Sequence, residues 1–231
     1  RALAACTALK VPSVLGLGET AGHAALLLEW LDLEPLREAA AAQRAVAALA
    51  ELHRCTQEHY GWPRANFIGR TPQHNAQSSN WPRFFIEQRL LPQFELAAAN
   101  GFRKALMAYA EPICAKLPAL FLEYRPQASL LHGDLWSGNL GALADGTPVL
   151  FDPACYYGDR ETDLAMSELF GGLPLAFYAA YRQAWPLDAD YERRKPAYNL
   201  YHILNHLNLF GRSYLAPAER LAAQLARDLG H

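Results

Sequence analysis

The sequence lacks long apolar runs and clusters of basic residues. Apolar stretches such as 24–28 are far shorter than the roughly 20 residues that a bilayer-spanning helix needs. The 21 lysines and arginines nearly balance the 23 aspartates and glutamates, so nothing indicates a basic tail suited to nucleic acid. We therefore expect neither a membrane nor a nucleic-acid partner.

Cysteine is also scarce, and its positions share no C-x-x-C spacing or other pattern typical of a metal site. Four thiols could form two disulfides, but a chain of 231 residues, 52% of them hydrophobic, can build a core without crosslinks. We therefore favour reduced thiols in a cytoplasmic protein. No secretory signal is visible, but the chain begins at Arg1 rather than Met, and we expect the true N-terminus to lie upstream. The cysteines are Cys6, Cys55, Cys114 and Cys155.

The pattern along the chain predicts a small β-containing segment followed by a mostly helical one. Residues 11–18 and 23–30 read as two antiparallel strands joined by a turn at 19–22. A short connector near 31–35 separates them from an Ala-rich stretch with helical periodicity. We therefore predict an α+β fold that divides into residues 1–34 and 35–231.

The remaining elements follow from periodicity and from Gly, Pro and Asn breakers. The spacing predicts the end of a helix at 2–9, helices over 39–59, 81–100, 102–116, 160–169, 174–185, 190–210 and 217–229, a polar loop at 62–79, a buried strand at 128–131, and a hairpin over 140–151 with an Asp145-Gly146 turn.

The most informative segment is His-Gly-Asp-Leu-Trp-Ser-Gly-Asn at 132–139, followed by a Val-Leu-Phe run that ends at Asp152. An aspartate in a loop after a buried strand can orient an acceptor hydroxyl and take its proton, so Asp134, ionised with an ordinary pKa, is the candidate base. Amide and carboxylate oxygens suit Mg²⁺, which makes Asn139 and Asp152 candidate metal ligands. Pro153 favours an extended backbone at Asp152. The alternative is that these are ordinary turn and capping residues.

The residues around this segment have supporting interpretations. His132 is expected to hydrogen-bond the neighbouring backbone and hold the loop rather than to act in catalysis. Gly133 stands where a protein kinase usually carries arginine, which favours a small-molecule acceptor. Asp163 lies in an acidic helix start, where it either caps the helix or ties down the 132–139 loop from below. Trp136 lies inside the loop and is a candidate lining residue of the acceptor site.

His202 and His206 are four residues apart, a spacing that metal-binding helices use. The glutamate of His-Glu-x-x-His is absent, since residue 203 is isoleucine. We therefore expect these histidines in the core or in a groove.

Taken together, these segments resemble the fructosamine-3-kinase (ketosamine-3-kinase) family, which has a protein-kinase-like fold related to aminoglycoside phosphotransferases. The resemblance extends over nearly the whole chain, and HGDLWSGN with FDPA and YGDRE is close to diagnostic. The segments that carry it are GHAALLLEWLDL at 22–33, ANFIGRTPQHN at 65–75, WPRFFIEQRL at 81–90, LLHGDLWSGNLG at 130–141, VLFDPACYYGDRETDLAMSELFGG at 149–172 and LYHILNHLNLFG at 200–211.

The resemblance implies a two-lobe kinase-like fold with a mostly helical C-lobe, and ATP and Mg²⁺ as cofactors. It implies that Glu29 and Leu31 offer backbone groups to adenine, with Leu28 behind them. The expected reaction is phosphorylation of the 3-hydroxyl of ketosamines, the glycation adducts of amines, which then detach, so that the activity is one of protein repair. On position in the motifs alone, Trp136, Tyr156 and His206 are expected near the sugar.

One departure from the family pattern concerns the N-lobe. Kinases of this fold use a strand lysine paired with a helix glutamate, and no such strand precedes Val11. Lys10 lies between the first helix and its strand, so it does not fit that position. We therefore expect a truncated N-lobe, weak nucleotide binding and poor turnover, if any, from this chain alone.

Two alternatives remain open at this point. A related small-molecule kinase could act on an aminoglycoside, choline or a sugar. A pseudokinase-like binding module could have lost the phosphate clamp altogether.

Overall fold

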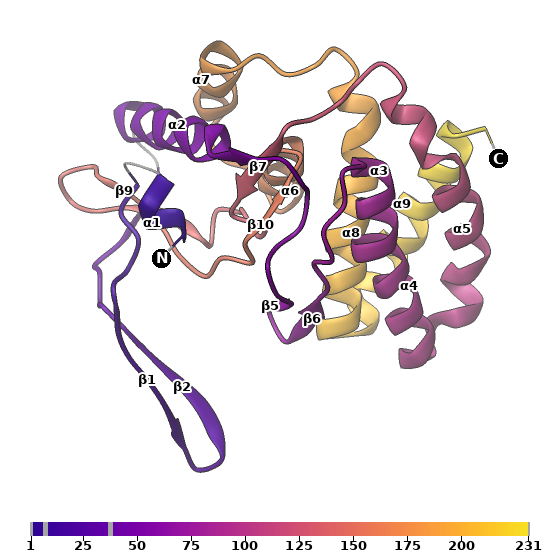
Figure 1. Ribbon diagram of the computed structural model, residues 1–231, viewed down its shortest axis with the longest axis horizontal. Coiled ribbons are helices and arrows are strands. Elements are labelled where there is room, and N and C mark those ends of the chain that lie inside the picture. Colours follow the sequence, from indigo (N-terminus) through magenta and orange to yellow (C-terminus); the bar gives the residue numbers. More distant parts are fainter. Residues whose placement is uncertain (1, 7–8, 37–38, 231) are drawn as a thin grey trace.

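The structure is a computed structural model that describes residues 2–6, 9–36 and 39–230, and Figure 1 shows a helical body from which one long β-hairpin projects. The hairpin pairs β1 (Val14–Thr20) with β2 (His23–Leu28) in antiparallel register, as the sequence predicts. Its turn contains Ala21 and Gly22 at positive φ, 49° and 77°, the geometry of tight two-residue hairpin turns. Most side chains of both strands are exposed, so the hairpin packs little against the body.

The helical body is built around α8 (Tyr191–Phe210), the longest helix of the described chain. Leu200, Leu204 and Leu207 recur at helical spacing and are fully buried, and α4, α6 and α9 pack against this helix. The α-helices are α1 (Ala2–Cys6), α2 (Ala39–Arg54), α3 (Trp81–Phe85), α4 (Leu91–Ala97), α5 (Arg103–Lys116), α6 (Glu161–Leu169), α7 (Leu175–Ala184), α8 and α9 (Leu215–Asp228).

The helix predicted over 81–100 is interrupted. It begins after Asn80, whose side chain caps the N–H of Arg83 at 2.8 Å. Two π-helical turns, Ile86–Leu90 and Ala98–Phe102, then flank α4. The run ends near the predicted Asn-Gly stop because Gly101 takes a φ of 92°, which helical residues do not adopt.

Helix α2 is shorter than predicted. Its small alanine side chains let it lie close to α7 and to strand β7, and most of them are buried. The expected helix to residue 59 ends at Arg54 because Thr56 and Gln57 pair with β7 instead. A pairing partner more than 70 residues away therefore decides where this helix stops.

Two small sheets hold the segment between residues 128 and 158. In one sheet β7 lies between β10 and β4, and in the other β8 lies between β3 and β9. The hairpin predicted over 140–151 is confirmed as β8–β9, with Leu140 opposite Leu150. The strands beyond the first hairpin are β3 (Glu34–Pro35), β4 (Thr56–Gln57), β5 (Asn66–Ile68), β6 (Thr71–Gln73), β7 (Ala128–Leu131), β8 (Leu140–Ala142), β9 (Pro148–Leu150) and β10 (Tyr156–Gly158).

Several strands differ from the prediction, among them β3, which lies in the expected connector and pairs with β8. The polar loop expected at 62–79 contains the β5–β6 hairpin, and β10 was not predicted at all. Local periodicity does not reveal β10, since it pairs with β7 across 25 residues or more, whereas β5 and β6 form a local hairpin too short to show a strand pattern. The part of the 2–9 prediction at residues 7–8 lies outside the described residues. Within the described ranges, no helix combines the length and apolar character that crossing a membrane requires.

Candidate functional site

The loop 132–139 connects the buried strand β7 to β8, and Asp152 follows β9. Since β8 and β9 are paired, the end of the loop and Asp152 lie at the same end of the hairpin, where Phe151 N donates to Asn139 O at 3.2 Å. The short antiparallel pairing of β8 with β9 therefore brings Asn139 and Asp152 to the same place.

His132 holds this loop in place. Asp134 N donates to His132 Nδ1 at 3.3 Å, which leaves Nε2–H to donate to the carbonyl of Phe151 at 2.9 Å. The imidazole is fully buried, and burial lowers its pKa, so the ring is neutral in this tautomer. These contacts support the predicted structural role.

Position 133 requires glycine for a steric reason that the sequence alone does not reveal. Its φ is 83°, and a Cβ at this position would collide with the carbonyl oxygen of Ala154. Ala154 N in turn donates to His132 O at 2.9 Å. The backbone of the loop and the backbone after Asp152 therefore lie in direct contact, and only glycine fits between them.

Asp134 lies at the centre of the candidate site. Its carboxylate Oδ2 and its own carbonyl accept hydrogen bonds from Asn139 Nδ2 at 3.3 and 2.9 Å, while Oδ1 is buried without a partner. Burial, with the nearby charges of Asp163 and Asp152, raises the pKa of Asp134 to about 6 despite the Asn139 bond. The expectation of an ordinary pKa was wrong, because the sequence does not show how deeply the loop is embedded. A raised pKa in a largely buried carboxylate is a feature that functional groups often have.

Asp152 has a left-handed backbone, with φ at 50°, rather than the extended one that Pro153 predicted. For a residue other than glycine such a conformation costs on the order of 1–3 kcal/mol and persists only where the neighbours hold it. Its neighbours do so: Phe151 bonds to Asn139 and His132, and Ala154 bonds to His132.

Asn139 and Asp152 supply a donor set that suits Mg²⁺. The amide nitrogen of Asn139 is engaged by Asp134, so its Oδ1 is the atom left for a ligand. Mg²⁺ bound to a nucleotide usually takes only one or two protein oxygens, together with phosphate and water. Among the residues that the structure describes, no group of three or more His, Cys, Asp or Glu side chains is placed to hold a metal ion.

Asp163, at the start of α6, supports the loop from below. Its two oxygens accept the N–H groups of His132 at 2.7 Å and Gly133 at 2.8 Å, and His53 Nε2 lies 3.2 Å from Oδ2. Burial alone would raise the pKa of Asp163, but these donors outweigh it and lower the pKa. The structure thus favours the tie to the loop over simple helix capping.

His53 is a residue that sequence reasoning missed. It lies in α2 and is fully buried, where its Nδ1 is 2.7 Å from the hydroxyl of Tyr181 and Arg160 also donates to that hydroxyl. With Nε2–H donating to Asp163, a chain of polar groups runs from Arg160 to the loop. No local pattern could have indicated His53, because its partner is 110 residues away.

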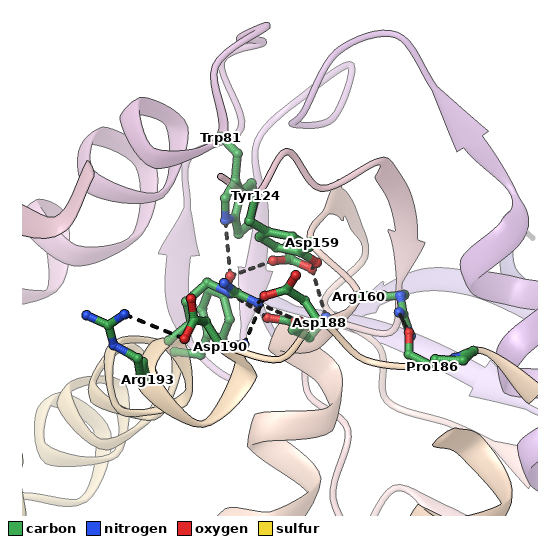
Figure 2. Close-up of polar contacts among 11 residues, drawn as sticks. Trp81, Tyr124, Asp159, Arg160, Pro186, Asp188, Asp190 and Arg193 are labelled. Atoms are coloured by element: carbon green, nitrogen blue, oxygen red, sulfur yellow. Dashed lines mark hydrogen bonds and ion pairs between the residues drawn. The ribbon is translucent and has the colours of Figure 1, made fainter. Parts of the chain in front are cut away.

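A second buried network fixes the start of α6. Figure 2 shows Tyr124 and Asp159 pointing toward one another, and Tyr124 donates to Asp159 at 3.1 Å. Tyr198 donates to the other oxygen of Asp159 at 2.6 Å, and Trp81 Nε1 donates to Tyr198. Glu161, two residues on, has its pKa raised to about 7 by burial and by Asp159. The helix that carries Asp163 is therefore anchored by several elements at once.

The residues expected beside adenine lie at the end of β2, which finishes at Leu28, and directly after it. Glu29 N–H donates to Ser13 O at 2.9 Å, so of its two backbone groups only the carbonyl could serve a nucleotide base. The Glu29 side chain bonds Lys10 Nζ at 2.7 Å, and this bond with that of Ser13 N lowers the pKa of Glu29 to about 2. Lys10 also pairs its backbone with β9 beside Val149. Leu28 and Leu31 are both half-buried.

The three residues expected near the sugar do not all lie together. Trp136 is partly exposed and its ring meets that of Phe170 edge-on, with centroids 6.4 Å apart. Phe170 also contacts the ring of His206, at 4.5 Å. Tyr156, by contrast, is fully buried beneath Arg89, so the expectation of a contact between Tyr156 and the sugar was wrong. It points inward because strand alternation sends its neighbour Tyr157 to the other face.

His202 is buried, as expected for a core histidine, and neither ring nitrogen has a hydrogen-bond partner. Burial lowers its pKa to about 3, so the ring is neutral. His206 instead bonds the carbonyl of His202 through Nδ1 at 2.8 Å.

Two free thiols, Cys114 and Cys155, have pKa values that burial raises to about 11 and about 12.

Comparison with known proteins gives one consistent result. The family model described as fructosamine kinase matches residues 1–228. A "probable ketoamine kinase" of Synechocystis sp. is 43% identical over 229 residues, covering 98% of this chain and 76% of that protein. A "probable ketoamine kinase" of Vibrio cholerae is 41% identical over 219 residues, covering 94% and 74%.

Solved structures agree with the sequence matches. A protein from Haemophilus somnus assigned as a fructosamine-3-kinase superposes with a TM-score of 0.88 at 31% identity, covering 96% of this chain and 75% of that one. One from Thermobifida fusca, assigned in the same way, gives 0.84 at 33% identity, covering 98% and 77%. An aminoglycoside phosphotransferase solved with GDP and kanamycin gives 0.60 at 12% identity, covering 99% and 80%, which shows a shared kinase-like fold.

Proposed function

This chain belongs to the fructosamine kinase family, a family of sugar-amine kinases, and from that premise we propose that it transfers the γ-phosphoryl group of ATP to the 3-hydroxyl of ketosamines. Ribulosamine and fructosamine adducts, which glycation leaves on amines, are the proposed acceptors. The phosphorylated adduct would then detach, which makes the activity one of deglycation in the cytoplasm.

The observation that carries this proposal is the environment of Asp134. Its carboxylate is held by Asn139, has one buried oxygen without a partner, and has a pKa raised to about 6. A base with such a pKa is mostly ionised at neutral pH and is still able to accept a proton. We assign the carboxylate of Asp134 to the acceptor hydroxyl.

The remaining residues of the loop orient this base. Asn139 holds the Asp134 carboxylate with its amide nitrogen, and Asp163 fixes the backbone of His132 and Gly133 beneath it. Asn139 Oδ1 and the Asp152 carboxylate would hold Mg²⁺, which neutralises the charge of the nucleotide phosphates when bound. We assign the adenine to the backbone of Glu29 and Leu31, beside Leu28.

The acceptor is assigned to the side of the loop that carries Trp136. The Trp136, Phe170 and His206 rings form a continuous aromatic surface beginning two residues after Asp134. Aromatic faces suit the apolar face of a sugar, and a histidine beside them can hydrogen-bond its hydroxyl groups.

The test is phosphate transfer from ATP to ribulosyl-lysine and fructosyl-lysine by the full-length protein. Wild type is compared with Asp134→Ala and with Asp145→Ala, an exposed aspartate in the β8–β9 turn that lies outside the site. We expect loss of transfer by at least two orders of magnitude in Asp134→Ala only. Equal rates in all three proteins would remove Asp134 from this role.

A panel of other acceptors separates the alternatives. Phosphorylation of an aminoglycoside or of choline, with ketosamines untouched, would assign the chain to another small-molecule kinase. Nucleotide binding without transfer to any acceptor would indicate a binding module.

A further inference from the structure

The β5–β6 hairpin reaches the two residues that follow the Asp152-Pro153 pair. Gln73 Nε2 donates to the carbonyl of Ala154 at 3.0 Å, and Asn66 Nδ2 donates to the carbonyl of Cys155 at 2.8 Å. Building on the proposed function, we propose that Gln73 and Asn66 are positioning residues for the Mg²⁺ ligand Asp152. They would set the metal affinity of the site without touching the metal.

The orientation of these amides is fixed by their own partners. Gln73 Oε1 accepts from the hydroxyl of Tyr201 at 2.7 Å, so its nitrogen is the atom that faces Ala154. Asn66 Oδ1 accepts from Gln73 Nε2 at 2.9 Å and from Asn75 Nδ2 at 2.8 Å, so its nitrogen is the atom that faces Cys155. Each amide therefore has one consistent assignment of oxygen and nitrogen.

The amide network is anchored in the core by a buried arginine. Arg89 donates from Nη2 to Asn75 Oδ1 at 2.8 Å and stacks on the ring of Tyr156, with Cζ 3.9 Å from the ring centroid. Arg89, Gln73 and Asn75 are all nearly or completely buried. Arg89 Nε has no partner, but the other polar atoms of this network are hydrogen-bonded, and rearranging them would leave buried polar groups unpaired.

This rigid network fixes the backbone next to Asp152. Asp152 has the left-handed φ of 50°, and the backbone before it is tied to Asn139 and His132. The bonds to Ala154 and Cys155 immobilise two successive peptide planes on the other side. With both flanks fixed, the backbone of Asp152 is held in one conformation, which restricts the rotamers open to its exposed carboxylate and so reduces the ordering needed when a cation binds.

The same contacts also explain a sequence segment that the reaction itself does not use. Asn66, Gln73 and Asn75 all belong to ANFIGRTPQHN at 65–75. The β5–β6 turn brings Asn66 opposite Gln73 in antiparallel register, which sets both amides on one side. We therefore assign this segment the role of a brace for residues 152–155, called the metal loop below.

The experiment must separate positioning from simple stability, and the chain offers a matched control. Gln93 in α4 is also a buried glutamine, with bonds to Asn205 and Asn208, but it contacts no residue of the metal loop. The variants are Gln73→Met and Gln93→Met, which remove the same amide from two buried networks. Asn66→Leu, at a less buried position, serves as the second variant should Gln73→Met fail to fold.

The readout is the Mg²⁺ concentration that gives half-maximal binding of ADP, measured by calorimetry in the full-length protein without any acceptor. Replacing a residue that orients a metal ligand typically lowers the metal affinity 10- to 100-fold. We expect a shift of about that size in Gln73→Met and Asn66→Leu, and none in Gln93→Met, although all three melt at lower temperature. Faster amide exchange at 152–155 in the first two variants would accompany it.

An unchanged Mg²⁺ midpoint in Gln73→Met and Asn66→Leu would overturn the inference, as would an equal shift in Gln93→Met. ADP binding by the wild type that does not depend on Mg²⁺ would overturn it too. The acceptor panel decides the proposed function separately, because it measures transfer to ketosamines and not the response to the metal.

Discussion

His53 Nε2 lies 3.2 Å from Asp163 Oδ2, and neither side chain is accessible to solvent. The contact joins helix α2 to the carboxylate that holds the backbone of the 132–139 loop. A buried carboxylate needs all its donors, so the geometry of the candidate base depends on a histidine that is remote in sequence.

Replacing His53 by phenylalanine should therefore loosen the loop. Asp163 loses one of its donors, and the hydroxyl of Tyr181 keeps Arg160 but loses the acceptor of its proton, at a cost of about 1–3 kcal/mol in the free energy of unfolding. Urea unfolding measures this, and the transfer rate should fall with it. His59→Phe, at a histidine outside the helix and partly exposed, is the control and should leave both quantities unchanged. Equal stability of the two variants would contradict the role of His53.

The rate should depend on pH through Asp134. With a pKa of about 6, the base is protonated and inactive at lower pH. We expect log kcat/KM to fall with unit slope below about pH 6, well above the pH at which an ordinary aspartate would titrate. A profile flat down to pH 5 would show that another group accepts the proton.

Asp134→Asn should abolish transfer and also stabilise the fold. The pKa of this carboxylate is raised from 3.8 to about 6 on folding, so the charged form destabilises the native state at pH values above 6. That cost is lost as the pH falls from 6 toward 4. We expect a gain on the order of 2 kcal/mol at pH 7.5, vanishing near pH 4, in denaturant melts of variant and wild type. A variant less stable than wild type at pH 7.5 would contradict this.

Gly133→Ala should be strongly destabilising. Its positive φ is unfavourable for alanine, and the added methyl group would collide with the backbone at Ala154. Gly22→Ala is the control, because that glycine also has a positive φ, 77°, but an added Cβ there meets no atom within 4 Å. We expect a loss of about 1 kcal/mol from strain alone at Gly22 and several times that at Gly133. Similar melting temperatures would show that the loop can move away from Ala154.

Arg194→Met should lower the free energy of unfolding, because buried carboxylates would then lack their cation. Figure 2 shows one of these carboxylates, Asp159. Arg194 binds both oxygens of Glu161, at 2.8 and 3.0 Å, inside the core. Without it, Glu161 loses the cation that binds both of its oxygens and repels Asp159 more strongly, although Asp159 keeps its tyrosine donors, at a cost of about 3–5 kcal/mol. Arg194 lowers the pKa of Glu161, so in the variant this pKa should rise above its wild-type value of about 7. The loss should therefore be largest at alkaline pH, shrink as the pH falls toward 7, and level off below it, where Glu161 is protonated in both proteins.

The control for that variant lies next to it in sequence. Arg193 makes an exposed pair with Asp190 at 3.5 Å, and Arg193→Met should cost less than 1 kcal/mol. Thermal melts across pH compare the two, and adding Glu161→Gln to Arg194→Met should recover part of the stability. A double variant no more stable than Arg194→Met would contradict this account.

The sequence predicted well what local patterns control. The β1–β2 pair, the β8–β9 hairpin with its Asp-Gly turn and the stop at Gly101 follow from residues close together in the chain. The candidate base and metal ligands could also be proposed from the sequence, because the 132–152 segment forms one short structural unit around the hairpin. Tyr156 was assigned wrongly because it was judged by closeness in sequence, whereas β10 turns its side chain into the core.

The sequence by itself determined which chemical groups lie within the 132–152 segment and which stretches form helices, since both depend on near neighbours. Only the tertiary structure decided that His53 meets Asp163, that Gln73 holds the carbonyl of Ala154, and that Asp134 is buried enough to have a raised pKa. The physical reason is that hydrogen bonding and desolvation depend on distances in space, and the chain brings these partners together from positions 81 to 110 residues apart.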